Sequence, residues 1–303
     1  MTDNLTRALV IGRRRPGRKI GAAVAETRQL LEAAGWKVES RVVKRKSALR
    51  GHAADAVKAG VDVVVAVGGD GAVLQVVNSL AETKVALGIV PKGTGNLLAG
   101  NLGIPHQLDD AVKILVDGHH RRIDLGRVAV DGNDLYFAVA CGVGFDARVM
   151  ATTDTAQKRR IGKLAYVVAA MRQTQHVRDV SHELTLDGTR TRSKAAQVFI
   201  ANFGAMGTLI KPRREIQPDD GLLDVIVVRA PGPLRGVLAG LEALSQRDLG
   251  STGGGHVFRT QAKEIRIETR RRRLVETDGS VIGSTPIVVS IRPAALTVIE
   301  PRT

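Results

Sequence analysis

The hydrophobic period of the chain changes abruptly at a cluster of glycines. Residues 63–67 form a continuous apolar run, of the kind that is buried on both faces of a parallel sheet. Gly68-Gly69-Asp70-Gly71 follows, and the chain then becomes apolar at helical spacing, at Val73, Val76, Val77 and Leu80. A buried strand, a glycine turn and an amphipathic helix in this order predict one unit of a parallel α/β sheet.

The first part of the chain repeats this alternation, and the rest does not. Strands are expected over 8–11, 36–43, 61–67 and 85–90, and helices over 20–34, 48–59, 73–80 and 107–117. After Arg121 the expected strands are 123–130, 135–140, 183–186, 195–201, 222–228, 263–267 and 286–291, with helices only near 158–174 and 233–246. We therefore expect a doubly wound α/β domain followed by a mainly antiparallel β domain.

The cysteine content and the N-terminus indicate a cytoplasmic protein. The single cysteine, Cys141, excludes a disulfide within the chain and fits a reducing compartment. It lies in an apolar run, so we expect a core residue and not a nucleophile. The first residues lack the pattern of a signal peptide, and no apolar run approaches the roughly 20 residues of a membrane span.

The charge balance favours an anionic partner. The sequence has 45 Lys and Arg against 30 Asp and Glu, a net charge of +15. The basic clusters are Arg13-Arg14-Arg15, Arg18-Lys19, Lys158-Arg159-Arg160, Lys211 with Arg213-Arg214, and 270–273. Such clusters suit a phosphate-rich ligand or an anionic membrane surface. With 3% aromatic residues and no recognition motif, a specific nucleic-acid binder is not expected.

Two glycine loops follow neighbouring expected strands. Ligands of open α/β sheets bind at the carboxyl ends of the strands, where backbone amides at a helix start favour anions. Asp70 would repel phosphate, so it fits either a metal ligand or a proton acceptor, while a plain Asp-Gly turn is the simpler alternative. A second loop, Gly93-Thr94-Gly95-Asn96, offers amides and a hydroxyl at another helix start. Together the loops predict one nucleotide-phosphate cleft.

A third glycine segment is not a P-loop. Residues 12–20 nearly match the phosphate-binding pattern, but Arg18 occupies the lysine position and no metal-binding hydroxyl follows. We retain this segment only as a basic contact to phosphate.

Five segments in order resemble the diacylglycerol kinase catalytic domain family, which includes bacterial lipid kinases and sphingosine kinases and is related to NAD kinases. These segments are 63–80, 88–105, 142–146 with the basic residues after it, 216–228 and 277–301. The resemblance implies a Rossmann-like ATP-binding domain over 1–122 plus a C-terminal return over 292–303. It also implies a β-sandwich lipid-substrate domain over 123–291, with ATP in the cleft between them.

The resemblance also implies an activity and its site. The γ-phosphoryl group of ATP would pass to a lipid hydroxyl, most simply that of diacylglycerol, at an anionic membrane surface to which the protein binds peripherally. ATP would contact Arg159 and the two loops, at Gly68, Gly69, Asp70, Gly71, Ala72, Gly93, Thr94, Gly95 and Asn96. Asp146 would face the lipid. Mg²⁺ would be held by Asp220 and by the carbonyls of Gln217 and Leu222, an oxygen-only ligand set.

The sequence departs from the family at positions that matter for catalysis. Ser280 stands where the family has the glutamate that is its proposed proton acceptor, and Ala72 replaces a threonine. A hydroxyl is a poor general base near neutral pH, so catalysis would rest on Asp70, helped at most by Asp278. Three hypotheses stay open: a lipid kinase, a member that binds nucleotide or lipid without turnover, and a kinase for another acceptor such as NAD. The oligomeric state, a homodimer included, is also open.

Overall fold

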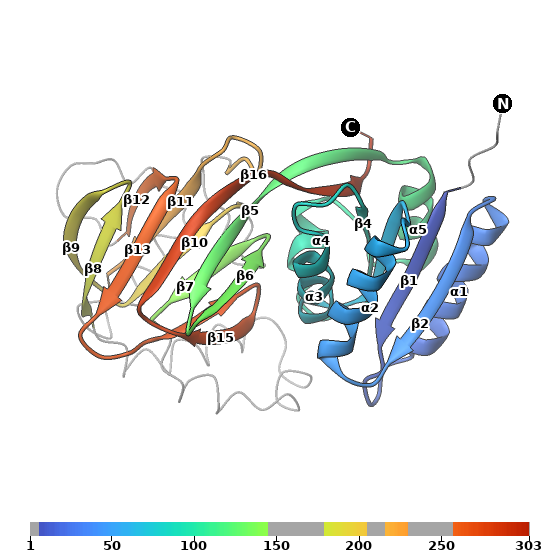
Figure 1. Cartoon of the computed structure of the whole chain (residues 1–303), viewed down its shortest axis with the longest axis horizontal. Helices are drawn as coiled ribbons and strands as arrows, with labels where there is room; N and C mark the ends of the chain where they lie inside the picture. The colour runs from blue at the N-terminus through green and yellow to red at the C-terminus, as the bar shows by residue number, and fades with distance from the viewer. Residues whose placement is uncertain (1–5, 145–178, 205–215, 230–256, 303) are drawn as a thin grey trace.

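The protein consists of two lobes, an α/β lobe and a β-sandwich lobe (Figure 1). A computed structural model describes residues 6–144, 179–204, 216–229 and 257–302. The helical segments expected near 158–174 and 233–246 lie outside these residues. Both the parallel first sheet and the antiparallel second part agree with the expected fold class.

The α/β lobe is doubly wound. Its strands are parallel in the order β2-β1-β3-β4, with α1 and α5 on one face and α2 and α3 on the other. The elements are β1 Arg7–Arg13, α1 Ile20–Ala33, β2 Lys37–Val43, α2 Lys46–Lys58, β3 Val63–Gly68, α3 Asp70–Leu80, β4 Ala86–Pro91, α4 Leu97–Asn101 and α5 Leu108–Asp117. Most expected boundaries agree with these to within two residues.

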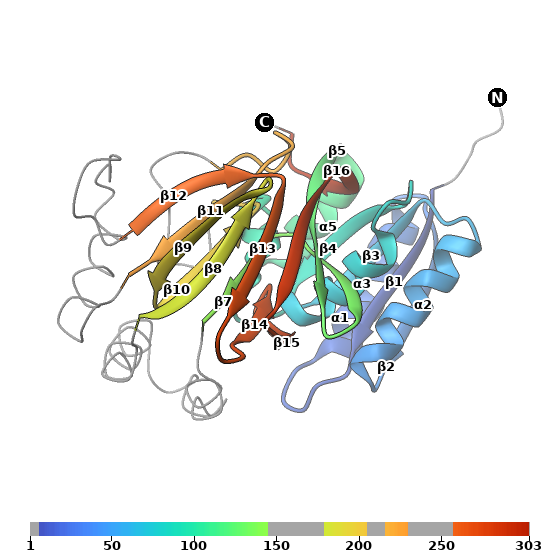
Figure 2. The same ribbon diagram turned by 60° about the vertical axis from the view of Figure 1, so that its left-hand side comes forward.

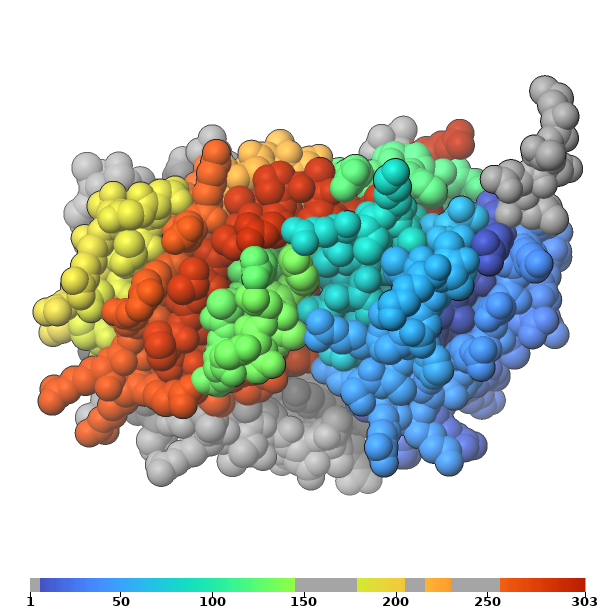
Figure 3. Space-filling model, in the orientation of Figure 1, coloured from blue at the N-terminus to red at the C-terminus, as the bar shows by residue number. Residues whose placement is uncertain are grey.

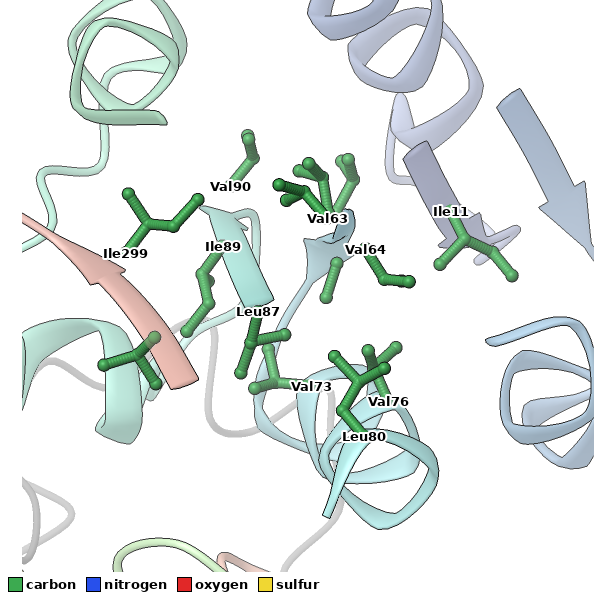
Figure 4. Packing of buried hydrophobic residues seen from close by; sticks show 14 of the residues in the cluster. Ile11, Val63, Val64, Val73, Val76, Leu80, Leu87, Ile89, Val90 and Ile299 are labelled. Carbon is green, nitrogen blue, oxygen red and sulfur yellow. The ribbon is translucent and has the colours of Figure 1, made fainter. Parts of the chain in front are cut away.

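Small aliphatic side chains build the core of this lobe. All residues of β3 and β4 are buried, as the continuous apolar runs predicted. Figure 4 shows Val73, Val76 and Leu80 of α3 packed toward Val64 and Leu87 of the sheet. Because each valine buries little area by itself, the lobe depends on many such contacts at close packing.

The second lobe is an antiparallel sandwich. Its strands are β5 His119–Val130, β6 Asn133–Phe137, β7 Ala140–Val143, β8 Val180–Leu186, β9 Thr189–Ala195, β10 Gln197–Ala201, β11 Leu223–Val228, β12 Val257–Ala262, β13 Glu264–Thr269, β14 Leu274–Thr277, β15 Ser280–Ser284 and β16 Ile287–Glu300. Among the described residues, one sheet has the order β12-β11-β10-β7-β14-β15. It packs against the sheet of β5, β16, β13 and β8 over a core that includes Phe137, Ile200 and Ile265.

One expected strand of this lobe is divided in the structure, and four observed strands were not expected. The single strand expected over 135–140 is two strands, because the chain turns at Ala138 and Val139 to join different sheets. The expectations missed β9, an exposed edge strand with few apolar residues, and they also missed β12, β14 and β15. An edge strand needs no apolar face, so hydrophobic alternation does not reveal it.

Two long strands connect the lobes. β5 and β16 pair antiparallel from Ile287 with Val130 to Glu300 with His119, and the end of β16 also pairs in parallel with β4. Their register is interrupted between Arg292 and Leu296. Figure 2 shows both strands running from the sandwich into the α/β lobe. The domain boundaries expected at 122/123 and 291/292 therefore fall inside paired strands and not in flexible linkers.

The lobes also share a surface contact. On the face shown in Figure 3, the green residues around the β5–β6 hairpin lie between the two lobes. The Asn78 side chain of α3 bonds to the backbone of β6 in the way that a neighbouring strand would. Its Nδ2 donates to the Tyr136 carbonyl at 2.9 Å, and its Oδ1 accepts the Tyr136 N–H at 2.9 Å.

Candidate functional site

The topological switch point of the first sheet lies between β1 and β3. β2 lies on one side of β1, while β3 and β4 lie on the other, so the connections diverge at this point. Crevices at the carboxyl ends of such strands are the usual ligand sites of open α/β sheets. The glycine loops 68–71 and 93–96 follow β3 and β4 at this edge, and residues 14–19 follow β1.

The two glycine loops pack directly on each other. A Cβ atom on Gly69 would lie 2.7 Å from the Cα of Gly93, and one on Gly93 would lie 2.5 Å from the Cα of Gly69. Backbone cannot yield to such a contact, so both positions require glycine whatever the ligand. From the sequence, we expected these glycines to let the backbone approach a ligand, and we did not expect the two loops to pack on each other. The packing does place the two loops side by side, as predicted.

Asp70 ties the first loop to the second. As the first residue of α3, it accepts the Asn96 N–H on Oδ2 at 3.0 Å and the Leu97 N–H on Oδ1 at 2.5 Å. The carboxylate thus caps the start of α4, where backbone N–H groups have no helical acceptor. A carboxylate offers about four lone-pair sites, so acceptor capacity remains for a metal or a proton.

The second loop is held by the Asn96 side chain. Asn96 is buried with a φ of 50°, its Oδ1 accepts the Gly93 N–H at 2.9 Å, and its Nδ2 lies 3.1 Å from His106 Nδ1. The side-chain amide expected to contact ATP is therefore used within the loop. Thr94 is exposed instead, and its Oγ1 accepts a hydrogen bond from Arg18 at 3.1 Å.

The first turn of α3 has N–H donors that no described residue accepts. The Ala72 N–H donates to the Gly69 carbonyl at 2.8 Å, so it is already engaged. The N–H groups of Asp70 and Gly71 precede that first intrahelical bond and can serve an anion. This turn and Arg18 therefore provide the donors that a phosphate chain requires.

Ser280 reaches this turn from the other lobe. It begins β15, and its Oγ accepts a hydrogen bond from Lys46 Nζ at 3.1 Å. A Cβ on Gly71 would lie 3.3 Å from Lys46 Nζ and 3.7 Å from Ser280 Oγ, so the three residues meet at the start of α3. Burial, with the nearby Arg13 guanidinium, lowers the pKa of Lys46.

Asp278 is a structural anchor in this arrangement. Its carboxylate accepts the backbone N–H groups of Ala138, Val139 and Ala140 at 2.9 to 3.0 Å. Burial raises the pKa of Asp278 to about 6, against the opposing effect of these hydrogen bonds. With three acceptor sites used and 8% of the residue exposed, Asp278 holds the β6–β7 turn and is poorly placed to assist a reacting group.

The residues expected to hold Mg²⁺ lie on one turn before β11. Asp220 is exposed, and its Oδ1 accepts the Leu222 N–H at 2.9 Å. Gln217 is five residues before Leu222, and Arg121 binds the neighbouring Asp219 at 2.8 Å. Within the described part of the chain, no group of three or more His, Cys, Asp or Glu could hold a metal. A cation here would rest on Asp220 and backbone carbonyls, a hard donor set that suits Mg²⁺.

Other sequence expectations have mixed outcomes. Arg159 and Asp146 lie outside the described residues. Cys141 is wholly buried, and burial raises the pKa of its thiol, which confirms a core role. None of the helices in the described ranges is both long and apolar enough to cross a membrane.

The sequence interpretation overlooked one basic cluster. Lys44, Arg45 and Lys46 follow the strand β2 directly, so they lie at the same sheet edge as the glycine loops. The signal was present, because a basic run at the end of an expected parallel strand belongs to the ligand edge. The importance of this cluster depends on the contact between Lys46 and Ser280, which cannot be predicted from the hydrophobic periodicity of the sequence.

Two family models match most of the chain. The diacylglycerol kinase catalytic domain matches residues 7–128, and the YegS C-terminal NAD kinase beta sandwich-like domain matches residues 139–300. The second match alone covers more than half of the chain. The boundary between the two models falls near the turn that Asp278 anchors.

Individual relatives agree with these matches. A diacylglycerol kinase of Mycobacterium tuberculosis strain H37Rv is 32% identical over 82% of this chain and 80% of the relative. The uncharacterized protein sll0036 of Synechocystis is 29% identical over 78% of this chain, which spans 54% of that relative's length. The crystal structure of a diacylglycerol kinase from Bacillus anthracis has a TM-score of 0.79, with 25% identity over 99% of this chain and 98% of the other.

Proposed function

Because the chain belongs to the diacylglycerol kinase catalytic domain family, we propose that it transfers the γ-phosphoryl group of ATP to the hydroxyl of diacylglycerol. The lipid oxygen would form the new P–O bond as the bond to the ADP oxygen breaks. The family implies use of ATP, while the acceptor is our proposal. The M. tuberculosis relative that carries the name diacylglycerol kinase supports this choice.

The observation that carries the proposal is the joined pair of glycine loops with cations around it. The loops pack together through Gly69 and Gly93, and Arg18 reaches Thr94 of the second loop. The carboxylate of the first loop, Asp70, is held by the backbone amides of Asn96 and Leu97. Phosphoryl transfer depends mainly on positioning and on neutralising charge, and this set of groups supplies both.

The position of each residue indicates its role in the reaction. The N–H groups at the start of α3 and the Arg18 guanidinium would bind the phosphates. Asp70 is the carboxylate beside the loops that retains acceptor capacity, so it would accept the proton of the attacking hydroxyl. Because the transition state is loose, this proton transfer contributes only part of the rate.

Mg²⁺ fits the proposal as a second requirement. When bound, it would neutralise phosphate charge near Asp70, and a structural ion would be held by Asp220 with the carbonyls of Gln217 and Leu222. The exposed carboxylate of Asp220 supports the second site.

Membrane attachment through a basic surface completes the proposal. Arg14, Arg15, Lys19, Lys44 and Arg45 are exposed at the ligand edge of the sheet. An anionic bilayer would attract them by roughly 1 kcal/mol for each residue near the surface. We expect the protein to sediment with vesicles that contain anionic lipid, and to be released by high salt. Equal binding to neutral vesicles would contradict this surface.

Labelled ATP tests the activity directly. The purified chain is incubated with γ-labelled ATP, Mg²⁺ and micelles of diacylglycerol, monoacylglycerol, sphingosine or ceramide, with NAD as a soluble acceptor. We expect label in phosphatidic acid, and loss of that label in Asp70→Asn. Transfer of the label to NAD would show that NAD, and not a lipid, is the acceptor. We do not expect this result, because the sequence has no Asn-Glu pair of the kind that NAD kinases use for the dinucleotide ribose.

One observation favours a second function. The position of the family's glutamate holds Ser280, whose hydroxyl is bound to Lys46. A member without this base could bind nucleotide and lipid without turnover. ATP binding with no labelled product from any acceptor would establish that function in place of the kinase.

A further inference from the structure

Lys46 reaches across the ligand edge of the sheet to the second lobe. It begins α2, three residues after the end of β2, while its partner Ser280 begins β15, 234 positions later in the chain. The Nζ atom lies 3.1 Å from Ser280 Oγ and within 3.3 Å of the point that a Cβ on Gly71 would occupy. The ammonium group therefore lies beside the first turn of α3 at Gly71.

No carboxylate among the residues that the structure describes pairs with the charge of Lys46. In the described ranges, no carboxylate is within ion-pair distance of Nζ, and the charged group that acts on it is Arg13, a like charge. Lys46 is half-buried, so water replaces the missing partner only in part. Its ammonium has three donors, and the Ser280 hydroxyl uses one. A cation with two unused donors beside the amides of a helix start favours the binding of an anion.

Two other roles for Lys46 fit this geometry less well. As a purely structural link between the lobes, it would be placed beside Arg13 at an electrostatic cost that an uncharged residue avoids. As a general base, it would have to be neutral, and a neutral amine would leave the phosphates with one cation fewer. A role in binding the polyphosphate of a nucleotide, by contrast, gives both Lys46 and Arg13 an anionic partner.

We propose that Lys46, oriented by Ser280, binds the phosphate chain of the nucleotide in this protein. A cation thus operates beside the position at which the family's carboxylate is replaced by Ser280. The proposal rests on the nucleotide site described above, but it requires no lipid turnover. Because Ser280 accepts from Lys46, its own O–H stays free to donate to a phosphate oxygen.

Nucleotide binding without a lipid acceptor tests the proposal. ATP with Mg²⁺ is titrated calorimetrically into the full chain and into Lys46→Met, Lys46→Arg and Lys58→Met. Loss of a charged hydrogen bond predicts ATP binding weaker by about tenfold or more in Lys46→Met, with most of the affinity restored in Lys46→Arg. Lys58 is an exposed lysine at the other end of the same helix, so Lys58→Met is the matched control.

Two variants of Ser280 separate charge from packing. Ser280→Ala removes the contact but leaves the ammonium free, so ATP binding should weaken by about threefold or less. Ser280→Glu places a carboxylate within ion-pair reach of Nζ, and we expect ATP binding weaker by about tenfold at unchanged melting temperature. ATP affinity that is unchanged in both Lys46→Met and Ser280→Glu would overturn the proposal.

The outcomes distinguish this proposal from the proposed function. ATP binding that depends on Lys46, with no lipid labelled, would keep the role of Lys46 and refute the lipid kinase. Labelled lipid with ATP binding that is indifferent to Lys46 would keep the kinase and refute the role of Lys46. Circular dichroism shows whether Lys46→Met is folded. If it is not, the ATP affinity of the folded Ser280→Glu variant tests the proposal.

Discussion

Asp70 Oδ2 lies 3.0 Å from the backbone nitrogen of Asn96, which joins the turn between β3 and α3 to the turn between β4 and α4. The same carboxylate accepts the N–H of Leu97. A residue expected to act on the ligand therefore also shapes the loop that would hold the ligand. Substitution of Asp70 will change loop geometry and chemistry together, and activity alone cannot separate the two effects.

Asp70→Asn should abolish turnover and loosen the second loop. The amide can accept one of the two N–H groups but presents an N–H₂ donor to the other, so we expect a loss of about 1–3 kcal/mol of stability. Amide hydrogen exchange at Asn96 and Leu97 should accelerate accordingly. Asp117→Asn, at the exposed end of α5, is the control that should change neither property. Lost turnover with unchanged exchange would assign Asp70 a purely chemical role.

The stability contribution of Asp278 should fall as the pH rises. Burial raises its pKa from 3.8 to about 6 in the folded protein. Below the unfolded pKa the group is neutral in both states. Above the folded pKa it is charged in both, and the folded state bears the cost of burial. This single group should therefore lower the free energy of unfolding by about 3 kcal/mol between about pH 4 and pH 6.

Urea unfolding of Asp278→Asn isolates that contribution. Asparagine cannot titrate, although it also accepts fewer of the three backbone N–H groups, so the variant should be destabilised throughout. Its deficit in the free energy of unfolding, relative to the natural sequence, should shrink as the pH rises from about 4 to about 6, the pKa of folded Asp278, and stay constant above that pH. A deficit that is constant with pH would mean that the carboxyl group has an ordinary pKa.

Asn78→Ala should weaken the contact between the lobes. The substitution removes both hydrogen bonds to the backbone of Tyr136, at 2.9 Å each, and leaves a partly buried N–H and carbonyl without these partners. We expect a loss of about 2–4 kcal/mol in the free energy of unfolding. Asn133→Ala, on the exposed end of the same hairpin, should cost less than about 0.5 kcal/mol. Equal effects from the two variants would contradict the specific role of Asn78.

Cys141 should be inert in the folded protein. Its side chain is wholly buried, and burial raises the pKa of the thiol, so the reactive thiolate is suppressed. A colourimetric thiol reagent should detect no cysteine in native buffer and one cysteine per chain in denaturant. Rapid labelling of the native protein would show that β7 opens readily.

Local patterns along the sequence determined most of the fold. The apolar run before Gly68 and the helical spacing after it predicted β3 and α3 because burial on a sheet and on a helix imposes different periods. The order of such units predicted a doubly wound lobe, and the change to short alternating strands predicted the second lobe. The edge strand β9 escaped this reasoning because its side chains are mostly exposed and need no apolar period.

Only the tertiary structure decided which groups meet at the site. Gly69 and Gly93 required glycine because two loops pack together, and Asp278 proved to be an anchor because a turn of β6–β7 closes on its carboxylate. Lys46 and Ser280 are 234 positions apart and belong to different lobes. Their contact depends on how β5 and β16 join those lobes, a long-range arrangement that periodicity, which records only local burial, does not encode.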